Sequence, residues 1–124
     1  MSFRQQIGQL GEEEAAKFLA QHGFKIIERN YRKPWGEIDL VAQKDKIVHF
    51  VEVKTVSRDP SALDPADYEP EDNLHPWKRK RLRRIIETYL LRSASDFDWQ
   101  VDAVSGYLNS QGETLKIDWL EDII

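Results

Sequence analysis

The amino-acid sequence predicts an α/β fold with the element order helix, three strands, helix, two strands (αβββαββ). Two segments repeat apolar residues at the spacing of an amphipathic helix, from Gln5 to about His22 and from Trp77 to about Arg92. Shorter apolar runs lie between and after them, each bounded by residues typical of turns. The length of 124 residues fits one domain that spans residues 1–124.

The two helices and the intervening turns justify this order. Ile7, Leu10 and Phe18 fall near one face of the first helix, and Gly23 is a typical residue to end it. The predicted strands cover residues 24–31, 37–43, 47–55, 99–108 and 114–119. Residues 57–76 hold four prolines and many acids, which predicts a long acidic surface loop.

The composition excludes several classes of protein. There are no cysteines, so disulfides and thiolate metal sites are excluded. The first residues lack the apolar stretch of a signal peptide, and no run approaches the roughly 18 apolar residues of a membrane span. We therefore expect a cytoplasmic protein without a membrane partner.

The net charge of -4 hides a strong segregation of charge. Only acids occur among the charged residues from Asp59 to Asp72, and only bases from Lys78 to Arg84. A basic run can neutralise the phosphates of a nucleic acid, and we expect that partner to be DNA. Bases at a helix start oppose the helix dipole, which favours a functional reason for them. The alternative is a solvated face whose bases pair with the acidic loop, and that loop could also mask the run. The predicted nucleic-acid-binding residues are Lys78, Arg79, Lys80, Arg81 and Arg84.

Charged residues end the apolar pattern of the third strand. Alternation puts Glu52 and Lys54 on the same face as Val48 and Phe50. Apolar residues on both faces of this strand are typical of a central strand covered on both sides.

The second strand repeats the feature. Alternation puts Glu37 and Asp39 on one face and Ile38 and Leu40 on the other. If the two strands pair, these acids converge with Glu52 and Lys54. Clustered carboxylates repel, and burying them unpaired costs several kcal/mol. A divalent cation such as Mg²⁺ or Mn²⁺ would relieve that cost, because it prefers carboxylate oxygens.

Lys54 adds chemistry to this candidate metal site. An ammonium group beside a bound cation can orient a water molecule or neutralise charge that develops on a phosphate. The segment from Asp39 to Lys54 has the form D-xn-E-x-K, with twelve residues between Asp39 and Glu52. This form is the core of the PD-(D/E)xK phosphodiesterase sites. The alternative is an ion pair between neighbouring strands, and spacing alone does not decide between the two.

Longer motifs extend this pattern over most of the chain. They are Gly8-x-x-Gly11-Glu12-x-x-Ala15, Arg29-Asn30-Tyr31-Arg32, Gly36-Glu37-Ile38-Asp39-Leu40, Phe50-Val51-Glu52-Val53-Lys54, Lys78 with Arg81-Leu82, and Val101-Asp102. With these motifs the chain resembles the YraN-like family of uncharacterised bacterial proteins, which resemble Holliday-junction resolvases and restriction endonucleases.

The resemblance implies a restriction endonuclease-like fold, with a mixed central sheet flanked by helices. It also implies a homodimer, because resolvases act as dimers. The roles it implies are metal ligation by Asp39 and Glu52, catalysis by Lys54, an accessory catalytic acid at Glu12, and an accessory position for Glu37.

The sequence departs from the family pattern after the lysine. The family usually has an arginine two residues after it, where this chain has Val56, and the nearest arginine is Arg58. The following loop is also unusually acidic. Both departures count against phosphate contact at this point.

The remaining aromatic and polar candidates favour structural roles. Trp35 could stack on a base, but we expect it to close a hydrophobic edge. Trp77, Trp99 and Trp119 are interpreted as core or helix-end residues. No metal-ligand spacing links His22, His49 and His75, and Asp102 is interpreted as a polar core residue.

Three functions follow as hypotheses. The first is a Mg²⁺-dependent endonuclease that acts on structured or branched DNA. The second is a non-catalytic nucleic-acid-binding module that retains the site as a relic. The third is a protein-interaction domain that uses the acidic loop.

Overall fold

The computed structural model of the protein describes residues 2–56, 76–93, 96–109 and 111–124. The predicted α/β element order is confirmed. Residues 57–75 of the predicted acidic loop lie outside the described residues, and Pro76 is the first residue of the second helix. In chain order the elements are α1 (Phe3–Gln21), β1 (Lys25–Lys33), β2 (Gly36–Lys44), β3 (Ile47–Val56), α2 (Pro76–Arg92), β4 (Asp98–Leu108) and β5 (Thr114–Leu120).

The five strands form one mixed sheet in the order β1-β2-β3-β4-β5. The first three strands are an antiparallel meander, and β5 is antiparallel to β4. Only the central β3–β4 pair is parallel, and α2 lies in the connection between these two strands. A parallel pair needs such a crossover connection, so the helix sits where the topology requires one.

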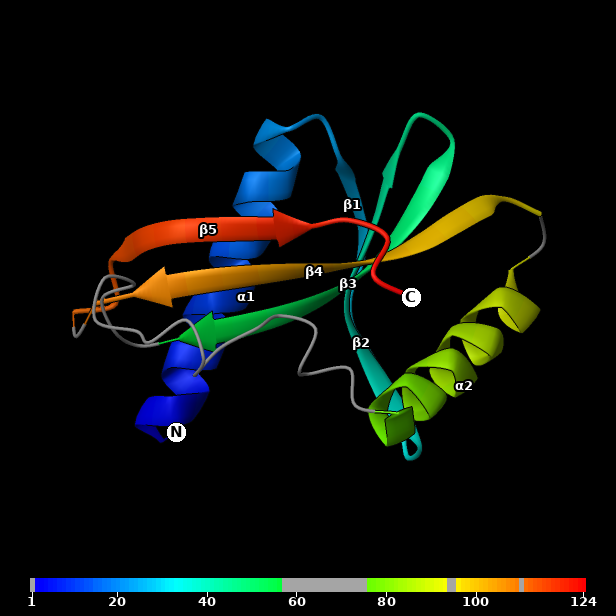
Figure 1. Ribbon diagram of the computed structural model, residues 1–124, viewed down its shortest axis with the longest axis horizontal. Coiled ribbons are helices and arrows are strands. Elements are labelled where there is room, and N and C mark those ends of the chain that lie inside the picture. Colours follow the sequence, from blue (N-terminus) through cyan, green and yellow to red (C-terminus); the bar gives the residue numbers. More distant parts are fainter. Residues whose placement is uncertain (1, 57–75, 94–95, 110) are drawn as a thin grey trace.

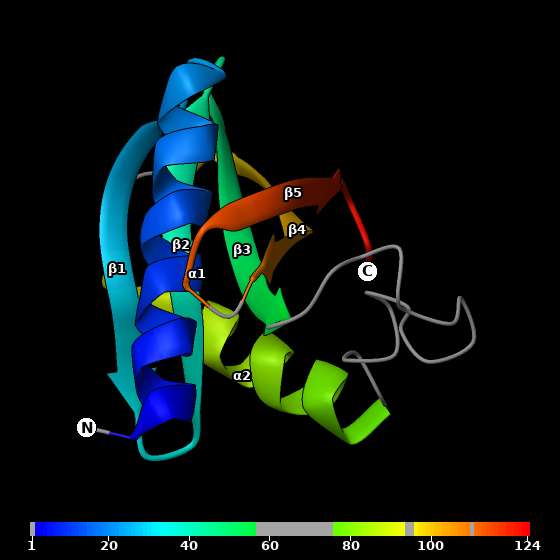
Figure 2. The same cartoon turned by 90° about the vertical axis from the view of Figure 1, so that its left-hand side faces the viewer.

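The two helices cover opposite faces of the sheet, as Figures 1 and 2 show. Phe50 packs with α2, whereas the next residue, Val51, packs with α1. This alternation makes β3 a strand covered on both faces, as its sequence predicts. The α2 side buries Tyr31, Ile38, Val41, Val48, Phe50, Leu82, Ile85, Ile86, Tyr89 and Val101. The α1 side buries Ala15, Ala16, Leu19, Phe24, Leu40, Ala42, Val51 and Val104.

Local sequence fixes both ends of α1. Ser2 accepts a hydrogen bond from the backbone N–H of Gln5, and the Gln5 side chain accepts one from the backbone N–H of Ser2. This reciprocal pair forms a capping box. At the other end Gly23 has a φ of 88°, which glycine adopts without strain, and the chain turns into β1. No helix in the described part of the chain is long and apolar enough to cross a membrane.

Candidate functional site

The candidate site lies where β2 and β3 separate. Their backbone pairing runs from Lys44 and Ile47 to Leu40 and Val51 and ends there. One residue further, the carboxylate of Asp39 accepts a hydrogen bond of 2.8 Å from the Val53 backbone N–H. A side chain of β2 thus replaces a backbone partner of β3, and this bond fixes the position of Asp39.

Both β1 and β2 change face at this point. In β1, Arg29 pairs with Glu13 of α1, whereas Tyr31 packs on the α2 side. In β2, Ile38 packs on the α2 side and Leu40 on the α1 side. The sequence-based prediction that Ile38 and Leu40 share a face is therefore wrong.

The backbone of β1 gives the physical reason for the change of face in that strand, and β2 changes face where it pairs with it. Asn30 has a φ of 52°, a left-handed conformation that breaks the two-residue alternation of a strand. The register pairs Arg29 with Leu40 and Tyr31 with Ile38, so Asn30 lies opposite Asp39. The change of face thus occurs at the same level in both strands.

A close approach of α1 to β3 brings Glu12 to the same place. Gly11 is buried, and a Cβ atom there would lie 1.8 Å from Oγ1 of Thr55. Only glycine allows this contact without a shift of helix or strand. The next residue, Glu12, is held beside the separated strand ends.

Glu12, Glu37 and Asp39 form a group that we call the carboxylate cluster. One carboxylate oxygen from each residue lies within 4.8 Å of the others. Arg32 forms an ion pair of 3.0 Å with Glu37 from the exposed side. Three acids so close together repel unless protons or a cation compensate their charge.

The side chain of Asn30 lies between two of these acids. The amide position that faces the cluster is 3.1 Å from Oε2 of Glu12 and 3.1 Å from Oε1 of Glu37. The nitrogen fits at that position, because there it can donate to both carboxylates. Asn30 therefore tethers α1 and β2 to β1.

Burial and neighbouring negative charges raise the pKa of Asp39, Glu52 and Glu12. Burial, followed by the charges of Glu12 and Glu37, raises the pKa of Asp39 to about 7 despite the Val53 hydrogen bond. Burial and the charges of Asp39 and Glu37 raise the pKa of Glu52 to about 8. The pKa of Glu12 is also raised, first by burial and then by Glu37.

The predicted site residues thus fall into two groups. Glu12, Glu37 and Asp39 share the carboxylate cluster, whereas Glu52 lies outside that group and interacts with it through its charge. Lys54 is half-buried two residues further along β3, where it lies opposite Ser105 of β4. Metal ligation by Asp39 and Glu52 and catalysis by Lys54 stay predictions.

Sequence reasoning gave no role to Asn30 or Arg32, which the structure brings to the cluster. Both belong to the Arg29-Asn30-Tyr31-Arg32 motif, which is the sequence feature that could have indicated a role for them. Their approach depends on the left-handed backbone of Asn30, which no periodicity reveals.

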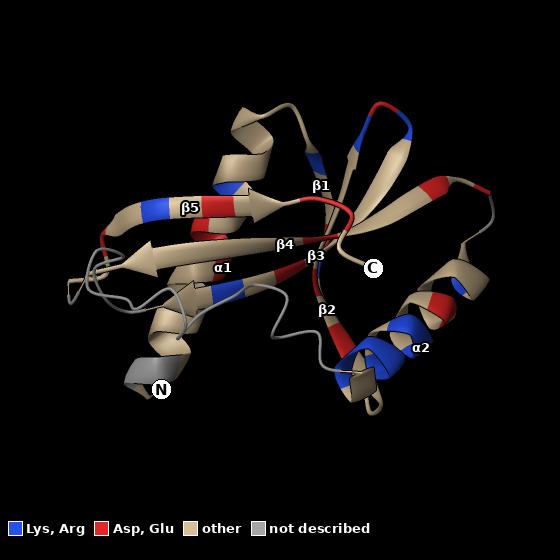
Figure 3. Ribbon diagram, viewed as in Figure 1, with Lys and Arg blue, Asp and Glu red and all other residues tan. Residues whose placement is uncertain are grey.

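The basic run covers the first part of α2, and its charged residues are exposed. Figure 3 shows this part of the helix in blue and acidic positions of β2 in red. Gly36 of β2 lies under the helix, where an added Cβ would be 3.2 Å from Ile85. Lys78 at the helix start acts on the pKa of Glu52 and lowers it. The exposed bases are Lys78, Arg79, Lys80, Arg81, Arg83 and Arg84.

The tryptophans take the predicted structural roles in part. Trp35 donates a hydrogen bond of 3.1 Å to Thr88 and packs against the α2 side of the core, so it closes a hydrophobic edge as predicted. Trp77 is 52% exposed and lies at the start of α2, so it is a helix-end residue as predicted. Trp119 packs against the α1 side of the core, as predicted. Trp99 is 42% exposed and lies in β4, so it is neither a core nor a helix-end residue.

A second group of polar residues lies on β3, β4 and the C-terminal segment. Asp102 is fully buried and accepts hydrogen bonds from Gln100, from Trp119 and from the backbone of Asp122. Nδ1 of His49 lies 2.6 Å from the same carboxylate. Asp102 is thus the polar core residue that the sequence predicts.

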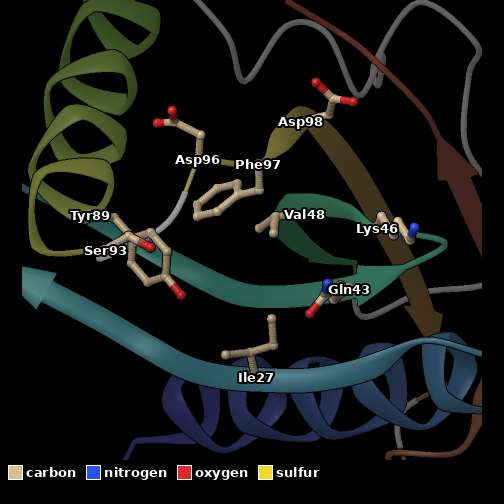
Figure 4. Close-up of a pocket in the computed structure, with 9 residues that line it drawn as sticks. All are labelled: Ile27, Gln43, Lys46, Val48, Tyr89, Ser93, Asp96, Phe97 and Asp98. Atoms are coloured by element: carbon tan, nitrogen blue, oxygen red, sulfur yellow. The ribbon is translucent and has the colours of Figure 1, made fainter.

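An open pocket of 690 Å³ lies at the other end of the sheet, beside the β2–β3 turn (Figure 4). Its walls include Gln43, Lys46, Tyr89 and Phe97. It contains none of the predicted catalytic residues, so it is separate from the candidate site.

Comparison with known proteins agrees with the sequence motifs. Residues 11–105 match the model of "Uncharacterised protein family UPF0102". A UPF0102 protein of Campylobacter jejuni is 39% identical over 97 residues, covering 78% of this chain and 80% of the relative. A UPF0102 protein of Moorella thermoacetica is 38% identical over 116 residues, covering 93% of this chain and 92% of the relative. The chain therefore belongs to the uncharacterised family UPF0102, the YraN-like family, which is part of the restriction endonuclease-like superfamily.

Proposed function

We propose that this protein is a metal-dependent endonuclease that hydrolyses phosphodiester bonds in structured or branched DNA. The carboxylate cluster is the observation that carries the proposal. Its three acids come from two elements that are distant in sequence, and Asp39 lies where two strands separate. Carboxylates that gather in this way, with a raised pKa at Asp39 and Glu12, are more typical of a functional site than of packing.

The chemistry of the donor set fits Mg²⁺ or Mn²⁺. Both ions prefer carboxylate and carbonyl oxygens, and the cluster offers only such ligands together with Asn30. Burial, together with the neighbouring carboxylates, raises the pKa of Asp39 and of Glu52, so a bound cation would favour the ionised form of both groups. When bound, a divalent cation would polarise a phosphate oxygen and lower the pKa of a water molecule.

The other residues take complementary roles in this proposal. Asp39 and Glu52 hold the cation, with Glu12 and Glu37 around it. Lys54 follows Glu52 on the same strand face, so its ammonium group can orient the attacking water or neutralise charge on the phosphate. The exposed bases of α2 hold the DNA backbone beside the carboxylates.

A second candidate function is a nucleic-acid-binding module without catalysis. The exposed basic run of α2 favours it, because that surface needs no metal ion to bind phosphates. This alternative predicts salt-sensitive DNA binding that is independent of Mg²⁺ and yields no product.

Cleavage of a four-way DNA junction in Mg²⁺ or Mn²⁺ tests the two candidates. We expect Asp39→Asn and Glu52→Gln to lose activity by about 100-fold or more while circular dichroism shows an intact fold. Glu113→Gln is the matched control, because Glu113 is an exposed acid outside both groups of potential metal ligands in the described residues. Full activity in either site variant contradicts the nuclease, and binding without product supports the second candidate.

A further inference from the structure

We propose that Asn30 binds the metal ion through its side-chain oxygen. Its side-chain amide would rotate when the ion binds, so that the oxygen replaces the nitrogen at the cluster. The inference rests on the proposed function and adds a ligand that the nuclease motif does not contain. It starts from the position of the Asn30 amide, 3.1 Å from both Glu12 Oε2 and Glu37 Oε1.

These separations match the geometry of a small hard cation. Mg²⁺ binds oxygens at about 2.0–2.1 Å in an octahedron, so neighbouring ligand oxygens lie about 3.0 Å apart. The cluster-facing amide position of Asn30 keeps this spacing to two carboxylates. An amide oxygen is a suitable ligand for such a cation because it is hard and adds no charge.

The nitrogen and the oxygen of the Asn30 amide suit the site without a cation and with a cation, respectively. Without a cation, the nitrogen faces the cluster and donates to both carboxylates, which offsets part of their repulsion. With a cation, the nitrogen is repelled and the oxygen is attracted. Because the two ends have nearly the same shape, rotation of the amide exchanges them without repacking.

The backbone aims this side chain at the cluster. Asn30 adopts a φ of 52° and lies opposite Asp39, at the level where β1 and β2 change face. Asparagine tolerates this conformation better than most residues with a side chain. Asp45 in the β2–β3 turn has the same φ of 52° and lies outside the cluster.

Mn²⁺ titration calorimetry on four proteins tests the assignment. Asn30→Gly removes the side chain at a φ that glycine accepts, and Asn30→Asp keeps the oxygen but removes the N–H donors. We expect Asn30→Gly to weaken Mn²⁺ binding about 10-fold or more and Asn30→Asp to bind at least as tightly as the wild type. Asp45→Gly controls for the backbone and should bind like the wild type.

The sign of the Asn30→Asp effect decides between a ligand and a mere hydrogen-bond donor. An equal loss in Asn30→Asp and Asn30→Gly, or no loss in Asn30→Gly, overturns the assignment while leaving the metal site intact. Absence of Mn²⁺ binding by the wild type instead overturns the metal site of the proposed function. The two failures are therefore distinguishable.

Nuclear magnetic resonance of the side-chain amides gives a second readout. The Asn30 amide signals are identified by their loss in Asn30→Asp. We expect saturating Mg²⁺ to shift them more than any other side-chain amide signals, because the amide exchanges two carboxylate partners for the ion. If the Asn30 signals do not shift at saturating Mg²⁺, the proposed rotation of the side-chain amide is wrong.

Discussion

Asp39 is half-buried and Asp102 is fully buried in the same sheet, and the groups around them differ. Asp102 has a hydrogen-bond partner at four places, with two partners on each carboxylate oxygen. Among the described residues, Asp39 accepts one hydrogen bond, from Val53, and faces two other acids. Burial alone therefore does not mark a functional acid. The absence of enough donors, combined with like charges nearby, is the sign that something else must compensate the charge.

The largest expected effect is on stability at Asp102. Replacement by asparagine leaves one acceptor oxygen and turns an N–H₂ group toward two donors. We expect Asp102→Asn to lower the free energy of unfolding by about 3 kcal/mol, measured by urea denaturation. Asp39→Asn is the matched substitution and should not destabilise the protein. Equal losses in the two variants would remove the distinction between Asp102, a structural acid, and Asp39, the proposed metal ligand.

The next effect is a dependence of stability on pH without metal. Unfolded carboxyl groups ionise near about pH 4, whereas the folded pKa is about 7 for Asp39 and about 8 for Glu52. Between these limits the folded state holds more protons, so the free energy of unfolding falls as pH rises from about 4 to about 8. Below about pH 4 and above about pH 8, these two groups do not change the free energy of unfolding with pH.

Asp39→Asn and Glu52→Gln isolate this contribution. Each variant should gain stability relative to the wild type at pH 8, on the order of 1–3 kcal/mol, and little at pH 4. Urea denaturation across the window in the presence of a chelator measures both values. A gain that does not depend on pH would show that repulsion among the acids is not its cause.

The sequence predicts the fold and part of the site because both depend on local patterns. The order of helices and strands and the double burial of β3 follow from apolar periodicity, and Glu37 and Asp39 stand out as acids in an apolar strand. Strict alternation failed at Ile38 and Leu40, because the strand changes face between them. The place of Asn30 in the site could not be predicted either. It depends on the left-handed backbone of this residue and on its contacts with α1 and β2, which apolar periodicity does not reveal. Glu12 was found only through the family resemblance, because one acid in the run Glu12-Glu13-Glu14 has no distinguishing pattern.

The smallest expected effect is on the pKa of Asp39 itself. Glu12 is the acid whose charge contributes most to raising it, after burial. Glu12→Gln removes that charge at nearly constant volume, so the pKa of Asp39 should fall by about half a unit to one unit. Carbon-detected magnetic resonance of the Asp39 carboxyl group during a pH titration measures this change.

Glu14→Gln is the control for the Glu12 substitution. It removes a charge from the same helix, where Glu14 pairs with Lys17 at 3.7 Å on the surface. The control should leave the pKa of Asp39 in place, because Glu14 is not among the charged groups that shift this pKa. If both variants shifted the pKa equally, the overall charge of α1 would control Asp39. A shift confined to Glu12→Gln would instead support local repulsion within the carboxylate cluster, the same imbalance of charge that a cation would neutralise.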